Sequence, residues 1–245
     1  MASKSRFAKH LLLKEIGQKG QEKFAAARVL IIGLGGLGSP LIRYLAAAGV
    51  GHFILYDDDI IEIDNLPRQN NYNLQDLDQS KIDISTQLIK QLNPEAQVTS
   101  YYKKATAKSL AALTDSYDYL VDATDNFATK FMLNKLALEQ GKILVSGSFT
   151  GFKGYAAIYK AGLVKDLPCY ACLHPENLSA ETEQACYKQG VFSAGVGVVG
   201  TFMAAELLKE IASINSSAGQ LMIFDFLTNQ QRMVKLAKRP DCICC

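Results

Sequence analysis

The feature that most constrains the fold is a glycine-rich turn close to the start of the chain. An apolar segment, residues 29–32, has the composition of a buried strand and runs directly into this turn. The turn contains four glycines: Gly33, Gly35, Gly36 and Gly38. Gly35 would let the backbone approach a phosphate, and Gly38 would permit close packing of a helix against the strand. Pro40 falls in the first turn of a helix expected to begin near Leu37, where its missing N–H is tolerated. The pattern predicts a nucleotide-binding strand–turn–helix unit.

A second apolar segment, residues 53–56, is followed by an acidic residue at the spacing expected of a ribose-binding carboxylate. Asp57 lies 57 − 38 = 19 residues after Gly38, and such an acid is expected about 20 residues after the last glycine. The alternative is a tight turn without a ligand, but strand, helix and acid all accompany these glycines. The first unit is therefore predicted to bind a ribonucleotide, either a dinucleotide or ATP.

Helix and strand patterns alternate along the rest of the first half. Helices are expected over residues 80–92, 107–113 and 128–139, and strands over residues 97–101, 117–122 and 143–146. This alternation predicts an α/β fold with a Rossmann-like, doubly wound and mainly parallel sheet. Residues 154–159, 220–226 and 231–236 are expected to extend the sheet as antiparallel strands. Residues 7–27 predict a helical extension of one or two helices, with a break at residues 17–20.

Length and composition favour a single domain over residues 1–245, because no Pro/Gly/Ser-rich linker or charge block interrupts the chain. We expect an N-terminal helical extension (residues 1–27), a nucleotide-binding half (28–147) and an antiparallel extension (148–245) with a crossover loop at 173–190. The net charge is small, 26 − 24 = +2, so neither nucleic acid nor a membrane surface is indicated. The apolar run after the basic N-terminus is too short for a signal peptide, which predicts a cytoplasmic protein.

Two cations follow the ribose-binding position and bear on which nucleotide binds. Arg68 and Lys81 are 81 − 68 = 13 residues apart, on an expected loop and at the start of the next helix. Both could face phosphates, although solvated surface cations are the common alternative. Cleavage between the α- and β-phosphates needs such charges because pyrophosphate leaves with several negative charges. A nicotinamide site does not need them, so this pair favours ATP.

A polar segment, residues 122–126, follows the fourth expected strand and belongs to the same edge of the sheet. A carboxylate there could reach a Mg²⁺ ion that bridges nucleotide phosphates. The alternative is an N-cap for the next helix. Asp122 suits the capping role, whereas Asp125 is the candidate for Mg²⁺ or ribose.

The cysteines form two Cys-x-x-Cys pairs, Cys169 with Cys172 and Cys242 with Cys245. Four thiolates in two such pairs suit a tetrahedral structural zinc ion with no open position for catalysis. A redox-active pair or unpaired core cysteines are the alternatives. Cys186 stands alone in a polar loop, where the nearby Lys188 could favour a thiolate; the alternative is a surface cysteine without a role.

Several motifs together resemble the E1-like adenylyltransferases of molybdopterin and thiamin biosynthesis. They are the glycine turn, residues 44–51, Asp57, Asn65-Leu66-Pro67-Arg68-Gln69, Lys81, Asn93-Pro94, Thr124-Asp125-Asn126, residues 168–172 and Gly190-Val191. Their order and spacing carry the resemblance, which runs from about Arg6 to Cys245.

The resemblance implies ATP-dependent activation of the C-terminal Gly-Gly carboxylate of a small ubiquitin-like sulfur-carrier protein, which gives an acyl-adenylate and pyrophosphate. A carboxylate is already ionised at pH 7, so this reaction needs no general base. The residues implied to hold the nucleotide are Gly33, Gly35, Gly36, Gly38, Asp57, Asp59, Asn65, Arg68, Gln69, Lys81, Asp125 and Asn126. Of these, Asn65, Arg68 and Lys81 would contact the phosphates and Asp125 would position Mg²⁺. Cys186 matches the position where relatives carry a cysteine that can accept the activated carrier or a sulfur atom.

The chain departs from the family pattern at its N-terminus, where relatives carry an arginine that reaches the partner subunit's ATP site. Lys9 occupies that position, and lysine keeps the charge but lacks the bidentate fork of arginine. Either Lys9 acts as a point charge, Arg6 replaces it, or turnover is slower than in relatives. Asp64 is a second departure, since serine is common before Asn65. No sulfurtransferase domain follows the zinc ligands, so a separate sulfurtransferase is expected.

The resulting prediction is a homodimeric adenylyltransferase with a structural zinc ion, and three rival functions remain open. A related enzyme could dehydrate a carboxylated tRNA nucleoside or activate another peptide. An NAD-dependent oxidoreductase could use the same fold, and a non-catalytic scaffold could bind a carrier without activating it. The glycine-rich residues 194–200, before an expected helix at 201–208, could pack at a dimer interface or in the core.

Overall fold

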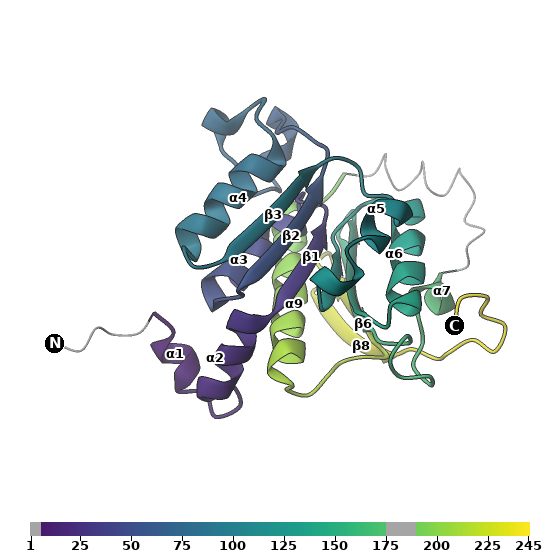
Figure 1. Ribbon diagram of the computed structural model, residues 1–245. Helices are drawn as coiled ribbons and strands as arrows, with labels where there is room; N and C mark the ends of the chain where they lie inside the picture. The colour runs from purple at the N-terminus through teal and green to yellow at the C-terminus, as the bar shows by residue number, and fades with distance from the viewer. Residues whose placement is uncertain (1–5, 175–189) are drawn as a thin grey trace.

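The computed structural model describes residues 6–174 and 190–245, and an eight-stranded sheet forms the centre of this part (Figure 1). The strands are β1 (Arg28–Ile32), β2 (His52–Asp57), β3 (Gln97–Tyr102), β4 (Tyr119–Asp122), β5 (Ile143–Thr150), β6 (Lys153–Tyr159), β7 (Gln220–Asp225) and β8 (Gln230–Lys235). Their order across the sheet is β3-β2-β1-β4-β5-β6-β7-β8. The first five strands in that order are parallel, and β5 to β8 pair antiparallel. The predicted fold class is confirmed.

Helices cover both faces of the sheet (Figure 1). One face packs against α2 (Gly17–Ala26), α3 (Gly38–Ala48), α4 (Lys81–Leu92) and α9 (Ser193–Ala212). The other face packs against α5 (Ala107–Ala111), α6 (Phe127–Glu139) and α7 (Tyr170–Leu173). The short helix α1 (Ala8–Leu11) and the 3-10 turns η1 (Ile63–Asn65), η2 (Leu74–Asp76) and η3 (Thr114–Ser116) complete the described elements. Because both faces are covered, β1 reads as an almost unbroken apolar run.

Two sequence-based predictions were wrong in position. The N-terminal extension does not break at residues 17–20, because α2 begins at Gly17 and continues through Gly20. Gly20 is needed inside the helix, since a Cβ there would lie 2.9 Å from Ile16 Cγ2. Residues 194–200 do not precede a helix but form the first turns of α9. Glycines weaken a helix only modestly, and tertiary packing offsets that weakness here.

The packing of α9 explains its glycines. A Cβ on Gly200 would lie 2.4 Å from the carbonyl oxygen of Leu37, at the start of α3. A Cβ on Gly36 would lie 2.6 Å from Val196 Cγ1 on α9. The N-terminal half of α9 therefore rests directly on the glycine turn.

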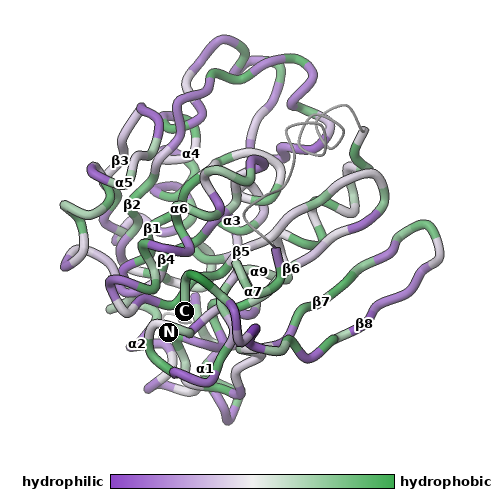
Figure 2. The backbone as a smooth tube through the Cα atoms, turned by 90° about the vertical axis from the view of Figure 1, so that its right-hand side faces the viewer, coloured by the Kyte–Doolittle hydropathy of each residue, from purple (hydrophilic) through white to green (hydrophobic). Residues whose placement is uncertain are grey.

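The antiparallel strands β7 and β8 form a hairpin that reaches away from the rest of the sheet (Figure 2). Every residue of β8 is exposed, and β8 is one of the two edge strands of the sheet. Lys235 and Arg232 place positive charge on this edge, which disfavours pairing with another strand.

Candidate nucleotide site and zinc site

The glycine turn lies where ligands bind in doubly wound sheets. After β1 the chain continues on one side of this strand to β2 and β3, whereas β4 lies on the other side of β1. The carboxyl ends of β1 and β4 therefore form a crevice. Gly33 follows β1 with a φ of +91°, and a Cβ there would lie 2.8 Å from the carbonyl oxygen of Ala123. A Cβ on Gly38 would lie 2.2 Å from the carbonyl oxygen of Gly33. Gly35 has only Gln69 near it, at 3.6 Å, so its backbone stays open to a ligand.

Asp57, at the end of β2, faces the glycine turn. Its Oδ2 accepts a hydrogen bond from the backbone N–H of Leu34 at 2.6 Å, and its Oδ1 accepts one from the N–H of Asp59 at 2.9 Å. Burial raises the pKa of this carboxyl above its usual value, while those two N–H groups oppose the rise. Each oxygen keeps a lone pair, so the carboxylate could still accept from ribose hydroxyls.

The segment between β2 and α4 brings two of the predicted residues, Arg68 and Gln69, to the glycine turn, and Asn65 lies in the same segment. Asn65 is buried, and its Nδ2 donates to Asp64 Oδ1 at 2.7 Å. Arg68 Nη1 donates to the carbonyl oxygen of Asp64 at 2.6 Å. The carbonyl of Arg68 lies beside Gly36, and the buried Gln69 amide lies beside Gly35. This arrangement places the segment against the same turn that would hold phosphates.

Lys81, the first residue of α4, is buried but pairs with a more exposed acid. Its Nζ lies 2.7 Å from Asp59 Oδ2, and the side chains are 6% and 65% exposed. A cation with most of its surface removed from water needs a negative partner. In the described structure Asp59 fills that role, at the edge of the same crevice.

The segment after β4 corrects one expectation. Asp122 is not an N-cap: it is buried, and its Oδ2 lies 2.9 Å from Lys130 Nζ and 2.6 Å from Ser146 Oγ. Its Oδ1 accepts hydrogen bonds from the backbone and hydroxyl of Thr124. The cap of α6 is Asn126, whose side chain accepts from the N–H of Thr129 at 2.8 Å. Asp125 is exposed between them, so its carboxylate is open to a cation.

The N-terminal residues lie at the other end of the sheet from the glycine turn (Figure 1). Arg6 donates to the carbonyl oxygen of Leu92 in its own chain and stacks over the Phe7 ring. Lys9 is exposed on α1, which packs against α2 at the amino end of β1. Within one chain, neither cation is placed to reach the glycine turn.

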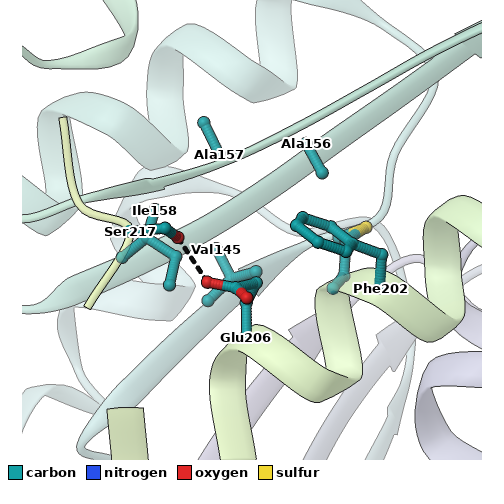
Figure 3. Close-up of a pocket in the computed structure, with 8 residues that line it drawn as sticks. Val145, Ala156, Ala157, Ile158, Phe202, Glu206 and Ser217 are labelled. Atoms are coloured by element: carbon teal, nitrogen blue, oxygen red, sulfur yellow. Dashed lines mark hydrogen bonds between the residues drawn. The ribbon is translucent and has the colours of Figure 1, made fainter. Parts of the chain in front are cut away.

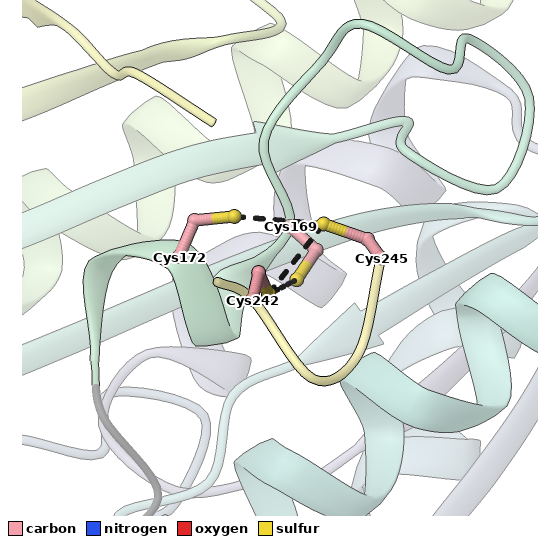
Figure 4. Close-up of side chains that lie close together, drawn as sticks. All are labelled: Cys169, Cys172, Cys242 and Cys245. Carbon is pink, nitrogen blue, oxygen red and sulfur yellow. Dashed lines mark hydrogen bonds between the residues drawn. The ribbon is translucent and has the colours of Figure 1, made fainter. Parts of the chain in front are cut away.

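Four cysteine sulfurs converge where the segment after β6 meets the C-terminus (Figure 4). The Sγ atoms of Cys169 and Cys242 are 3.7 Å apart, and those of Cys172 and Cys245 are 3.5 Å apart. Sulfurs bound tetrahedrally to zinc at about 2.3 Å would be roughly 3.8 Å apart. Burial raises the pKa of Cys169 to about 11, so a divalent cation is the charge that would favour its thiolate. The described residues fit a zinc ion with four protein ligands.

Two cavities differ in what they could hold. A cavity of about 10 Å³ under α9 contains Glu206 and Ser217, which are hydrogen-bonded to each other (Figure 3). This space is no larger than one water molecule and is excluded as a ligand site. An open cleft of about 630 Å³ lies between α3, α9 and the segment 67–70, with Tyr44, Arg68 and Val198 among its lining residues.

Cys186 and most of the expected crossover loop lie outside the described residues. Sequence reasoning also missed Lys130 and Tyr72, both of which support the crevice from within the core. Lys130 carried a weak signal, since a lysine among apolar helix residues is rarely buried without a partner. Tyr72 carried none, because a lone tyrosine in a polar loop has no distinctive spacing.

Comparison with known proteins supports the same family. The model of the ThiF family matches residues 7–244. The sulfur carrier protein ThiS adenylyltransferase of Escherichia coli (strain K12) is 37% identical over 240 residues, covering 98% of this chain and 94% of the relative. The sulfur carrier protein adenylyltransferase of Thermus thermophilus is 35% identical over 243 residues, covering 98% and 90%. The chain belongs to the ThiF family, and the expected membership among E1-like adenylyltransferases is confirmed.

Longer relatives and solved structures add to this comparison. The adenylyltransferase and sulfurtransferase MOCS3 of Bos taurus is 37% identical over 242 residues, and the chain spans 52% of its length. The crystal structure of E. coli MccB with ATP superimposes with a TM-score of 0.84 at 21% identity, covering 99% of this chain and 75% of that one. At this identity the likeness concerns the fold. Within the described residues, none of the helices is both long enough and apolar enough to cross a membrane.

Proposed function

We propose that the chain is an ATP-dependent adenylyltransferase that activates the C-terminal Gly-Gly carboxylate of a small ubiquitin-like sulfur-carrier protein. The observation that carries this proposal is the position of Arg68, Gln69 and Lys81 close to the glycine turn and Asp57, which are expected to hold a ribonucleotide. Arg68 lies beside Gly36, and Gln69 lies beside Gly35. Lys81 pairs with Asp59, whose backbone N–H donates to Asp57. The family membership and the names of the relatives support the same reaction.

In this reaction one carboxylate oxygen of the carrier attacks the α-phosphorus of ATP. The bond from the α-phosphorus to the oxygen that bridges the α- and β-phosphates breaks, and pyrophosphate leaves with the electron pair. Arg68 and Lys81 offset the charge that develops on the leaving group, and Asn65 donates to a phosphate oxygen. Asp57 accepts from ribose, and the glycine turn holds the phosphates through its N–H groups. A Mg²⁺ ion held by Asp125 would add further charge stabilisation at the phosphates.

The test is carrier-dependent exchange of labelled pyrophosphate into ATP. Candidate proteins that end in Gly-Gly, taken from the same source, should support exchange, and the same carriers without the last glycine should not. ATP with Mg²⁺, but not NAD, should raise the melting temperature. ATP binding without exchange for any carrier would favour the scaffold, whereas stabilisation by NAD would favour an oxidoreductase.

The proposal includes a homodimer in which a second copy covers the cleft between α3 and α9. Tyr44 and Val198 line this cleft and are 53% and 42% exposed. Lys9 lies too far from its own glycine turn to act there, so it would contact phosphates in the partner's site. A zinc ion, a separate sulfurtransferase and a cytoplasmic location belong to the same proposal, as does a single adenylation domain over residues 1–245.

Subunit mixing tests the shared site. Lys9→Ala and Arg68→Ala should each lower exchange, because each site would lose one of its cations. A one-to-one mixture should regain about a quarter of the wild-type activity, since half of the dimers would then contain one intact site. The Lys153→Ala variant, whose exposed lysine lies on β6, serves as the mixing control. Two impaired variants that stay dimeric and regain nothing on mixing would contradict the contribution of Lys9 from the partner.

A further inference from the structure

The backbone of Leu34, the residue between the first two glycines of the turn, is held on both sides. Its N–H donates to Asp57 Oδ2 at 2.6 Å. Its carbonyl oxygen accepts from the hydroxyl of Tyr72 at 2.8 Å and from Ser39 Oγ at 3.3 Å. The Tyr72 bond is the shorter of the two and comes from a residue 38 positions away. The conformation of the turn therefore depends on a side chain outside it.

Tyr72 belongs to the segment that carries the proposed phosphate contacts. Its backbone N–H donates to the carbonyl of Gln69 at 3.2 Å, which ties it to the residue after Arg68. Its side chain is buried and packs with Ile61, Ile84 and neighbouring apolar residues. Movement of this tyrosine would therefore move the phosphate-binding segment as well.

The same hydroxyl also reaches α4. Tyr72 Oη lies 3.1 Å from Ser85 Oγ, and both side chains are buried. Ser85 is one helical turn after Lys81, so the two residues share a face of α4. When the Tyr72 hydroxyl donates to Leu34, Ser85 is the donor to Tyr72 Oη, and each hydroxyl hydrogen has an acceptor. One phenol thus joins the glycine turn, the Arg68 segment and the Lys81 helix.

We propose that Tyr72 is a positioning residue that fixes the glycine turn relative to Arg68 and Lys81 for binding of the ATP phosphates. This inference deepens the proposed function and rests on it. Tyr72 does not itself touch the substrate. Burial raises the pKa of its phenol above the usual value, so the group stays a hydrogen-bond donor at every pH at which the enzyme is active.

If Tyr72 had only a structural role, removal of its hydroxyl would lower stability without changing ATP binding. The chain offers a matched control for this comparison. Tyr117 is also fully buried, and its hydroxyl donates to Gln140 Oε1 at 2.5 Å. It lies just before β4, at the end of that strand away from the glycine turn. Tyr→Phe at either position keeps the ring and removes the hydroxyl, which takes part in two hydrogen bonds at Tyr72 and in one at Tyr117. Both variants should therefore lose stability, Tyr72→Phe somewhat more, but only Tyr72→Phe should disturb the turn.

Two measurements test the proposal on the full-length protein. Tyr72→Phe should raise the KM for ATP about three- to tenfold, the range expected from loss of the one hydrogen bond to Leu34, whereas Tyr117→Phe should leave the KM for ATP unchanged. Hydrogen–deuterium exchange of residues 33–38 should be faster in Tyr72→Phe by a similar factor and unchanged in Tyr117→Phe. Ser85→Ala should act in the same direction, and the double variant should show less than the product of the two effects.

The outcomes separate this inference from the proposed function. If the wild type does not bind ATP, the proposed function fails, and the exchange of residues 33–38 still shows whether Tyr72 holds the turn. Unchanged hydrogen exchange in Tyr72→Phe would overturn the inference. Faster hydrogen exchange of residues 33–38 in Tyr72→Phe, together with an unchanged KM for ATP, would also overturn it. The hydroxyl would then hold the turn without serving nucleotide binding.

Discussion

Arg68→Ala is expected to lower the rate of carrier-dependent pyrophosphate exchange about 10³-fold. Removal of one preorganised group that stabilises transition-state charge typically costs that much in rate. In the described part of the chain Arg68 has no ion-pair partner, and one of its N–H groups donates to the carbonyl of Asp64. The remaining donors are therefore available to phosphate. The rate of exchange should fall while the melting temperature changes little.

Two control variants make this expectation specific. Arg232→Ala removes an arginine from the exposed strand β8, remote from the glycine turn, and should leave exchange unchanged. Cys186→Ala should also spare exchange, since its thiol is proposed to act only after the acyl-adenylate has formed. If Arg68→Ala kept more than a tenth of the wild-type rate, Arg68 would not stabilise the leaving pyrophosphate.

Loss of zinc is expected to have the largest effect on stability. The purified protein should contain one zinc ion per chain, and Cys242→Ser should remove it, because the four sulfurs all lie within 4.8 Å of one another. Structural zinc contributes directly to folding, and its loss is among the few changes that exceed about 4 kcal/mol. For a chain of this size, that corresponds to a fall of about 10 °C in melting temperature. Metal analysis and thermal unfolding measure the two effects.

Cys244→Ser provides the matched comparison, since Cys244 is two residues from Cys242 but outside the four-sulfur set. It should keep both zinc and stability. A full complement of zinc in Cys242→Ser would show that the metal binds elsewhere. A zinc-free wild type with unchanged stability in Cys242→Ser would show that the cysteines are merely packed together.

The parallel half of the fold was predictable because its signals are local. The apolar run before Gly33 predicts a buried strand, and the spacing of Asp57 after the glycines places it at the end of the next strand. These two strands pair parallel, as expected. The positions of Arg68 and Lys81 near the turn also followed from their place after β2. The roles of these residues in catalysis stay predictions.

The errors arose where contacts between distant parts of the chain outweigh local preference. Asp122 precedes a helix, which favours capping, but the buried ammonium group of Lys130 pairs with its carboxylate. The glycines of residues 194–200 were expected to precede a helix that begins at residue 201, but they belong to α9, and Gly200 lets the helix approach Leu37. The hydroxyl of Tyr72 acts across 38 residues, and no pattern within a sequence window could reveal it.

The contact between α9 and the glycine turn limits how the chain could be recombined with its relatives. Gly36 and Val196 belong to different halves of the sequence, as do Leu37 and Gly200, yet each pair leaves no room for an added methyl group. In a chimera with a crossover point between the halves, the incoming α9 would need equally small residues at these positions. A bulkier one would displace the turn and with it the nucleotide. Gene shuffling within the family should therefore yield active enzymes only when both sides of this contact come from compatible parents.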